Sequence, residues 1–200
     1  MPRPSLLIAA ALIVATAAPS VAQELSMPES MAFLKAVRER DGAAAESILS
    51  NPASSAINAR DGRGEGALHI LVRGRDLNWL AFLLGRGARA NMQSNDGTTP
   101  LGLAAQIGWQ EAAELLIARG ASVDLANNRG ETPLILAVHS RAGDVVRLLL
   151  AQGADPDRTD SAAGYSALDY ARRDTRDPTL LRIFQNTAPR APQQVMGPTR

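Results

Sequence analysis

The chain has 200 residues, of which 46% are hydrophobic, so it can bury a core and is not wholly disordered. Its 21 basic and 20 acidic residues leave a net charge of +1, which gives no electrostatic reason to expect nucleic-acid binding. Cysteine is absent, which excludes disulfides, thiolate metal sites and a cysteine nucleophile. Aromatic residues make up only 4%, so the core must come from closely packed Ala, Leu, Ile and Val.

Residues 1–22 have the three-part pattern of a secretory signal peptide. Arg3 supplies a positive charge, a continuous apolar run extends from Leu6 to Ala18, and small residues end the segment at Ala22. The run is shorter than the roughly 20 residues that a membrane-spanning helix needs, and an uncleaved anchor is the alternative. We expect cleavage after Ala22, a linker at 23–29, and a mature protein in the bacterial periplasm with no membrane insertion.

From residue 58 onward, five series of residues recur at intervals of 33. The series are Leu68, Leu101 and Leu134; Gly64, Gly97 and Gly130; Gly87, Gly120 and Gly153; Leu83, Leu116 and Leu149; and Asn58, Asn91, Asp124 and Asp157. Five series in one register indicate a repeat architecture, in which each unit stacks on the next.

The copy at 97–124 shows what each repeat contains. Thr99 can cap a helix with its side-chain oxygen, and Pro100 follows at the first helical position, where a missing N–H costs nothing. After a short turn, a second apolar helix ends at Gly120, where a left-handed residue is needed. Gly97 lies in a polar stretch that predicts a tight hairpin. The next copy, at 130–157, repeats these features in the same register.

These motifs, with TPLGLAA at 99–105 and TPLILAV at 132–138, resemble the ankyrin repeat. The resemblance implies an all-α repeat fold, an ankyrin-type α-solenoid of stacked helix-turn-helix units joined by β-hairpin loops. It covers residues 30–184, with repeats at about 30–58, 59–91, 92–124, 125–157 and 158–184. The proline-rich tail, 185–200, is predicted to be disordered.

The histidines and tryptophans receive mainly structural interpretations. His69 falls at the position of the family's TPLH motif, so we expect it to pack or to form hydrogen bonds. His139 ends a first helix, where a surface contact is favoured over a ligand. We expect Trp79 to be buried beside Leu80, whereas Trp109 could be buried or could be a half-exposed binding anchor.

The sequence contains no motif for catalysis, metal binding or cofactor binding. No GxSxG, phosphate-loop, HExxH or EF-hand pattern occurs. The two histidines belong to separate, non-adjacent repeats, too far apart along a solenoid to share a metal ion. We therefore expect a non-enzymatic protein with no cofactor; a hydrolase using His139 with Ser140 is the least favoured alternative.

The resemblance implies that a protein partner, of unknown identity, binds the concave surface of the hairpins and first-helix ends. The side chains expected on this surface are mostly polar or charged, with a few apolar ones. They are Arg60, Arg63, Glu65, Arg73, Gln93, Asn95, Asp96, Thr98, Gln106, Ile107, Trp109, Asn128, Arg129, Glu131, His139 and Ser140. We expect a monomer that does not bind nucleic acid. The second interpretation is a structural or stress-protective envelope factor without one defined partner.

Overall fold

The computed structural model describes residues 27–51, 54–176 and 178–187, where ten α-helices and one short 3-10 helix follow one another. The helices form five pairs: α2 (Glu29–Glu39) with α3 (Gly42–Leu49), α4 (Ala67–Arg73) with α5 (Leu77–Gly85), α6 (Pro100–Gln106) with α7 (Gln110–Ala118), α8 (Pro133–His139) with α9 (Gly143–Ala151), and α10 (Ala167–Arg173) with α11 (Pro178–Thr187). The 3-10 helix, η1, spans Ala56–Asn58. The predicted signal peptide and residues 188–200 of the predicted tail lie outside the described residues.

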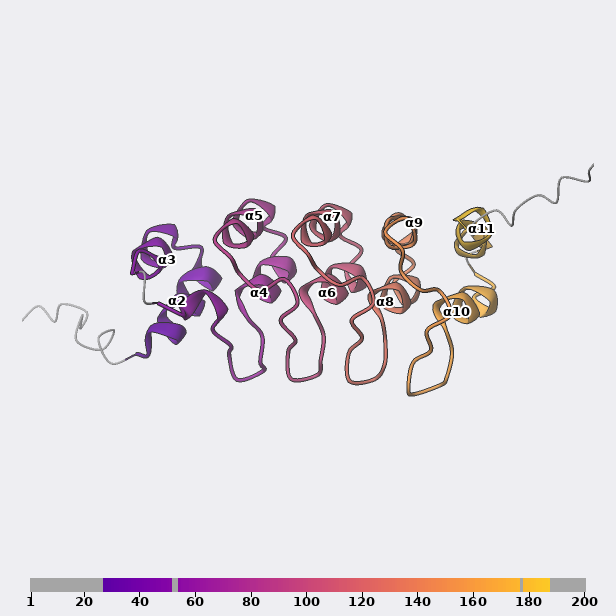
Figure 1. The fold of residues 1–200 in the computed structure, drawn as a ribbon, viewed down its shortest axis with the longest axis horizontal. Coiled ribbons are helices and arrows are strands. Elements are labelled where there is room, and N and C mark those ends of the chain that lie inside the picture. Colours follow the sequence, from indigo (N-terminus) through magenta and orange to yellow (C-terminus); the bar gives the residue numbers. More distant parts are fainter. Residues whose placement is uncertain (1–26, 52–53, 177, 188–200) are drawn as a thin grey trace, which may run out of the picture.

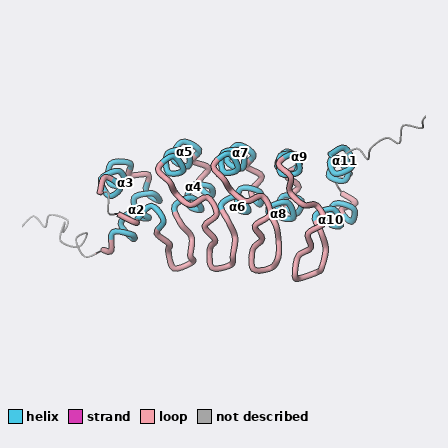
Figure 2. Tube along the Cα trace, in the orientation of Figure 1, coloured by secondary structure: helices cyan, strands magenta, loops and turns pink. Residues whose placement is uncertain are grey.

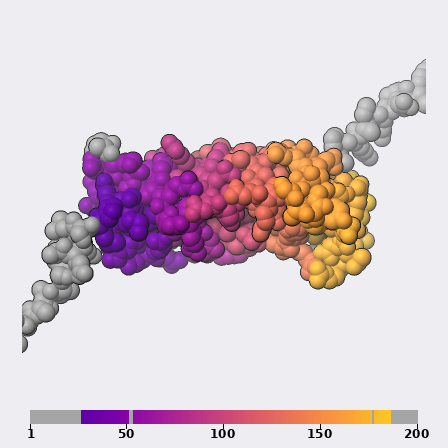
Figure 3. Space-filling model, turned by 90° about the horizontal axis from the view of Figure 1, so that it is seen from below, coloured from indigo at the N-terminus to yellow at the C-terminus, as the bar shows by residue number. Residues whose placement is uncertain are grey.

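The helix pairs stack in two layers to form one elongated body. The first helix of each pair lies in one layer and the second in the other, and loops project beyond the first helices (Figure 1). Figure 2 shows that these projections are loops rather than strands, and Figure 3 shows successive repeats following one another along the body. In the first layer, α6 packs between α4 and α8. The predicted all-α repeat fold is confirmed.

The helices α6 and α8 begin at the positions that their capping residues predicted. The Thr99 hydroxyl accepts a hydrogen bond from the N–H of Gly102 at 3.0 Å, and Thr132 does the same for Ile135 at 3.3 Å. Pro100 and Pro133 are the first residues of α6 and α8. Local chemistry therefore determines where these two helices start.

The projecting loops are hairpins that turn at glycines. In the hairpin of the third repeat, the N–H of Ser94 donates to the carbonyl of Thr98 at 3.0 Å, and Gly97 has a φ of 81°. A Cβ atom on Gly97 would lie 2.5 Å from Oδ1 of Asn128, so position 97 requires glycine for space as well as for conformation. Among the described residues the only ladder pairing is one bridge, between Thr159 and Ser166.

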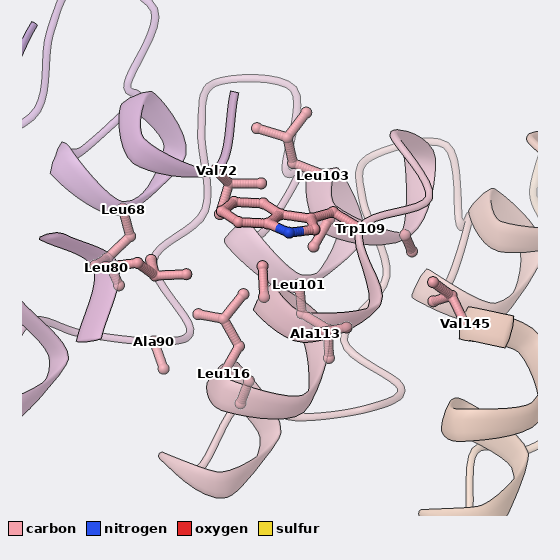
Figure 4. Packing of buried hydrophobic residues seen from close by; sticks show 14 of the residues in the cluster. Leu68, Val72, Leu80, Ala90, Leu101, Leu103, Trp109, Ala113, Leu116 and Val145 are labelled. Atoms are coloured by element: carbon pink, nitrogen blue, oxygen red, sulfur yellow. The ribbon is translucent and has the colours of Figure 1, made fainter. Parts of the chain in front are cut away.

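The repeating leucines make a continuous core. Leu101 and Leu134 are both 0% exposed, and Leu68 is 4% exposed, so the three are buried alike. Figure 4 shows Leu68 and Leu101 within the packed cluster. Leu168, at the corresponding position of the last repeat, is only half-buried because no further helix pair among residues 27–51, 54–176 and 178–187 covers α10. The last helix, α11, ends at Thr187, beyond the boundary predicted at residue 184.

Candidate functional site

The predicted binding residues lie on three hairpins and at the ends of α4, α6 and α8. We call this the inner surface: the projecting hairpins together with the exposed ends of the first helices (Figure 1). The structure separates the predicted residues into those that join neighbouring repeats and those whose side chains remain available to a partner.

Four of the predicted residues join one hairpin to the next. The guanidinium of Arg60 donates to the carbonyls of Gly64, at 3.1 Å, and Gln93. The side-chain amide of Gln93 donates to the carbonyl of Ala126 at 3.0 Å. Two more amides complete the series: Asn95 donates to Gly62 at 3.0 Å and Asn128 donates to Asn95 at 2.9 Å. Arg60, Gln93, Asn95 and Asn128 therefore stabilise the stack.

Two acidic residues at equivalent positions hold cations from both sides. Glu65 is only 8% exposed, which corrects its prediction as a surface residue. It lies between Arg63, at 3.0 Å, and Arg73, at 2.5 Å, because a carboxylate buried this far needs charged partners. In the fourth repeat, Glu131 lies 2.7 Å from Arg129 and 3.9 Å from Nδ1 of His139.

The Glu131 carboxylate raises the pKa of Arg129, mainly through their hydrogen bond. The arginine partners of both carboxylates remain accessible: the side chains of Arg63, Arg73 and Arg129 are 72%, 54% and 66% exposed. Each carboxylate therefore orients cations that still face solvent.

The hairpin between them carries the opposite charge. Asp96 is exposed and accepts hydrogen bonds from the hydroxyl of Ser94 and from the N–H and hydroxyl of Thr98. The Ser94 hydroxyl is the main cause that holds the pKa of Asp96 below its usual value. Gln106, at the end of α6, is exposed. The hairpin tips thus alternate in charge along the stack, as Arg63, Asp96 and Arg129.

Trp109 is not a surface anchor. Its side chain is 7% exposed and belongs to the hydrophobic cluster with Val72 and Leu101 (Figure 4). The guanidinium of Arg75, from the preceding repeat, lies 6.0 Å from the centre of the ring. Burial decides between the two interpretations that the sequence left open, because the preceding repeat covers the indole.

The sequence predicts that Trp79 is buried and that Ile107 lies on the binding surface, and the structure places both at intermediate burial. Trp79 is half-buried rather than fully buried, and it contacts Phe82 edge to face with ring centres 5.4 Å apart. Ile107 is also half-buried, and its carbonyl accepts a hydrogen bond from Arg75 at 2.8 Å.

His139 and Ser140 do not form a nucleophile–base pair. The Ser140 hydroxyl lies 2.9 Å from the carbonyl of Ala105 and 3.1 Å from that of Ala137, so it connects α8 to the preceding repeat. His139 instead packs edge to face on Tyr170, with ring centres 4.4 Å apart. This geometry gives the hydrolase alternative no activated hydroxyl.

The last repeat contains an aromatic cluster that the sequence patterns did not indicate. Tyr165 contacts Tyr170 at 5.6 Å between ring centres, and the guanidinium of Arg173 lies 4.4 Å from the Tyr165 ring. The Tyr170 hydroxyl donates to Asp160, which raises the pKa of Tyr170 to about 12. Arg173 follows His139 by one repeat length with a single insertion, and that spacing could have identified it.

The aromatic cluster borders a shallow hollow at the end of the inner surface. The hollow has a volume of ≈ 300 Å³ and is lined by His139, Tyr170, Arg173 and neighbouring residues of α8 and α10. Tyrosine, histidine and arginine together offer apolar contact and hydrogen bonds, the combination found at the energetic centres of protein interfaces.

His69 has the structural role that its position predicts. It is 1% exposed; its Nδ1 accepts from the N–H of Gly66 at 3.2 Å, and its Nε2 lies 2.9 Å from the carbonyl of Thr98. Since the carbonyl can only accept, the proton resides on Nε2. Burial is the main cause that lowers the pKa of His69. The side chain thus joins the start of α4 to the next hairpin.

The described part of the chain offers neither a metal centre nor a membrane span. No group of three His, Cys, Asp or Glu side chains there is arranged to hold a metal ion. No helix among those residues has the length and apolar character needed to cross a membrane.

The stacked helix pairs and hairpins define a helical repeat scaffold that presents one long surface, a class in which binding rather than chemistry is the usual activity. A family model described as ankyrin repeats (3 copies) matches residues 33–124 and 68–160. The chain therefore belongs to the ankyrin repeat family, whose members generally act as protein–protein interaction modules. No curated protein matches the chain.

Proposed function

We propose that this protein is an exported, non-enzymatic scaffold that binds a protein of the bacterial cell envelope through its inner surface. The observation that supports this most directly is a column of three side chains at one register position: Arg73, Gln106 and His139. Each ends the first helix of its repeat, each is exposed, and the repeats that carry them are consecutive.

Two further features support binding by this column. The oriented arginines beside Glu65 and Glu131 offer hydrogen-bond donors, and the hollow beside Tyr170 offers apolar contact. The hairpin tips beside the column alternate in charge, as Arg63, Asp96 and Arg129, which suits a folded protein surface better than a uniformly charged polymer.

The export step of the proposal rests on the sequence alone. The pattern of residues 1–22 is that of a secretory signal, and the absence of cysteine is compatible with an oxidising compartment. The direct test is the N-terminal sequence of the protein isolated from the periplasmic fraction. A protein that begins at Gln23 supports export with cleavage, whereas a protein found only in the cytoplasm contradicts it.

The binding step is tested by crosslinking and affinity capture from periplasmic extract. The inner variant combines Arg73→Ala, Gln106→Ala and His139→Ala. The matched control combines Asn78→Ala, Glu111→Ala and Asp144→Ala, three exposed residues that also share one register position but lie on the second helices. We expect wild type and control to capture the same stoichiometric partner and the inner variant to lose it.

Two outcomes would contradict this assignment. Equal capture by all three proteins would move the binding site off the inner surface. If no stoichiometric partner is captured while deletion of the gene still impairs the envelope, a structural or stress-protective role is favoured instead.

A further inference from the structure

The segments that follow the second helices form a ladder along one face of the stack. We call residues 86–91, 119–124 and 152–157 the linker face. The Asn91 side chain accepts from the N–H of Ser122 at 2.7 Å, and Asp124 accepts from the N–H of Asp155 at 3.1 Å. In the same way Asn58 accepts from the N–H of Arg89 at 2.9 Å. Successive linkers are thus joined by equivalent bonds, which places equivalent residues at regular intervals.

The charge of the linker face changes in even steps along this ladder. Residues 86–91 carry two positive charges, from Arg86 and Arg89. The middle linker, 119–124, carries one charge of each sign, and residues 152–157 carry two negative charges. One register column shows the change directly, because Arg89, Ser122 and Asp155 occupy equivalent positions and all three are exposed.

These charges are not neutralised by ion pairs within the molecule. Among the ion pairs of the described residues, none involves a charged side chain of the linker face. By contrast, the inner surface pairs Glu65 and Glu131 with arginines. The linker face is therefore a set of charges arranged in order, all exposed to solvent except Asp124, which is half-buried.

The helix ends explain only the basic half of the gradient. Arg86 and Arg119 directly follow α5 and α7, whose C-terminal ends carry partial negative charge and favour cations. Asp155 and Asp157 follow α9, where the same field disfavours acidic residues. No ion pair of the described residues includes Asp155 or Asp157, although the exposed Arg158 follows them in the chain, and the acidic half is complementary in sign to the basic half.

We propose that the linker face binds a second copy of this chain, antiparallel, about a two-fold axis near Ser122. A surface whose charge reverses sign about its centre complements itself under such a rotation. Arg89 then lies opposite the second copy's acidic half, and Asp155 lies opposite its basic half. Ser122, which is small and uncharged, lies at the axis. The monomer expected from the sequence is then in reversible equilibrium with this dimer.

A hollow lies at each half of the linker face. A hollow of ≈ 790 Å³ lies at the basic half, lined by Arg60, Arg89 and Arg119 among others. A second hollow of ≈ 790 Å³ lies at the acidic half, where Asp155 borders apolar residues such as Phe184. Arg172 also lines the second hollow, but it pairs with Asp169 on its own helix at 3.5 Å. The two-fold rotation places the arginines that line the first hollow opposite the carboxylates that line the second, and the long arginine side chains can extend across the space between them.

Sedimentation velocity of the purified chain tests the proposal. Exposed ion pairs are individually weak and are screened by salt, so we expect dimers at about 0.01 M ionic strength and monomers at about 1 M. Arg89→Asp and Asp155→Arg should each weaken dimerisation by about tenfold or more, because each creates two like-charge contacts per dimer.

An equimolar mixture of the two variants provides the sharpest test. One variant then carries only acidic residues at positions 89 and 155 and the other only basic ones, so the mixture should form heterodimers although neither variant dimerises alone. The matched control is Arg182→Asp, which makes the same change of charge at an exposed position of α11 that lines neither hollow. It should dimerise like wild type.

Three results would overturn the proposal. Wild type could remain monomeric at low salt, the mixed variants could fail to associate, or species larger than dimers could form, which would indicate open head-to-tail assembly. If wild type stays monomeric but Arg89→Asp abolishes capture of an acidic protein, the basic half binds that protein instead. The capture experiment on the inner surface changes other residues, so its result does not depend on whether the chain forms dimers.

Discussion

At the scale of single residues, the most informative side chain is His69, because one imidazole satisfies two buried groups of different repeats. The imidazole accepts from the N–H of Gly66 and donates to the carbonyl of Thr98, which also accepts from the N–H of Ser94. Protonation would place a second N–H against the N–H of Gly66, so the folded state needs the neutral ring.

Because the folded state needs the neutral ring of His69, we expect the protein to lose stability in mild acid. The pKa of the folded state lies below the ordinary value of 6.5, so only the unfolded chain gains a proton as the pH falls through 6.5. The free energy of unfolding is highest above pH 6.5 and should decrease below it, by at most about 1.4 kcal/mol per pH unit from this residue. Urea unfolding at several pH values measures the slope.

The control for this prediction is His69→Gln, which cannot take up a proton. The variant should lose the His69 part of the slope between pH 6.5 and the folded-state pKa, whereas His139→Gln leaves that part in place. Equal slopes for wild type and His69→Gln would show that His69 does not titrate differently on unfolding.

At Arg75 the backbone conformation is unfavourable, whereas the side-chain contact is favourable. It has a φ of 52°, which is unfavourable for any residue with a Cβ atom, yet its guanidinium donates to the carbonyl of Ile107 in the next repeat. Gly108 has the same left-handed conformation at the equivalent position. At position 75 the contact made by arginine therefore opposes its backbone preference.

Two substitutions at position 75 separate these effects. Arg75→Ala loses the contact and keeps the strain, whereas Arg75→Gly loses the contact and removes the strain. We expect Arg75→Gly to be more stable than Arg75→Ala by about 1 kcal/mol, measured by thermal or urea unfolding. The reverse order would mean that the turn tolerates a Cβ atom without strain.

At the scale of the helix, each first helix from α4 to α10 has a side chain that caps its start, but the chemistry differs between repeats. Thr99 and Thr132 use a hydroxyl, Ser166 and Asp169 cap each other's N–H groups, and Gly66 has no side chain and relies on His69. The requirement for a capped start is shared, and each repeat meets it with its own residues.

The cap of α8 gives a prediction with a conservative control. Thr132→Ala leaves the N–H of Ile135 without its acceptor in a buried position, so it should lower the free energy of unfolding by about 1–2 kcal/mol. Thr132→Ser keeps the hydroxyl and should recover most of the loss. A serine variant as unstable as the alanine variant would assign the effect to the missing methyl group.

At the scale of the molecule, stability comes from contacts between neighbouring repeats. Each interior repeat is covered on both sides, while the last repeat is covered on one, which is why Leu101 is fully buried and Leu168 is half-buried. The cost of the same substitution should therefore depend on the place of its repeat in the stack.

The leucine positions test this dependence. Leu101→Ala should lower the free energy of unfolding by about 3–5 kcal/mol, and Leu168→Ala by clearly less, about 1–2 kcal/mol, because the cavity at the end opens to solvent. Urea denaturation of both variants makes the comparison. Equal losses would contradict a core built from neighbour contacts.

The sequence alone determined the features that depend on local backbone chemistry. The capped starts of α6 and α8, the hairpin turn at Gly97 and the buried leucines could be predicted, because a helix cap, a left-handed residue and an apolar face each act over a short stretch of chain. The interval of 33 then indicated that these units stack.

Only the tertiary structure decided which side chains remain available to a partner. The burial of Glu65 and Trp109 and the amide bonds between hairpins were decided by that structure, whereas the exposure of Arg73, Gln106 and His139 was already predicted from the repeat register; the amide bonds depend on the adjacent repeat. That repeat is distant in sequence but in direct contact in space. A pattern within one repeat cannot report what the next repeat covers, because the covering side chains belong to another part of the sequence.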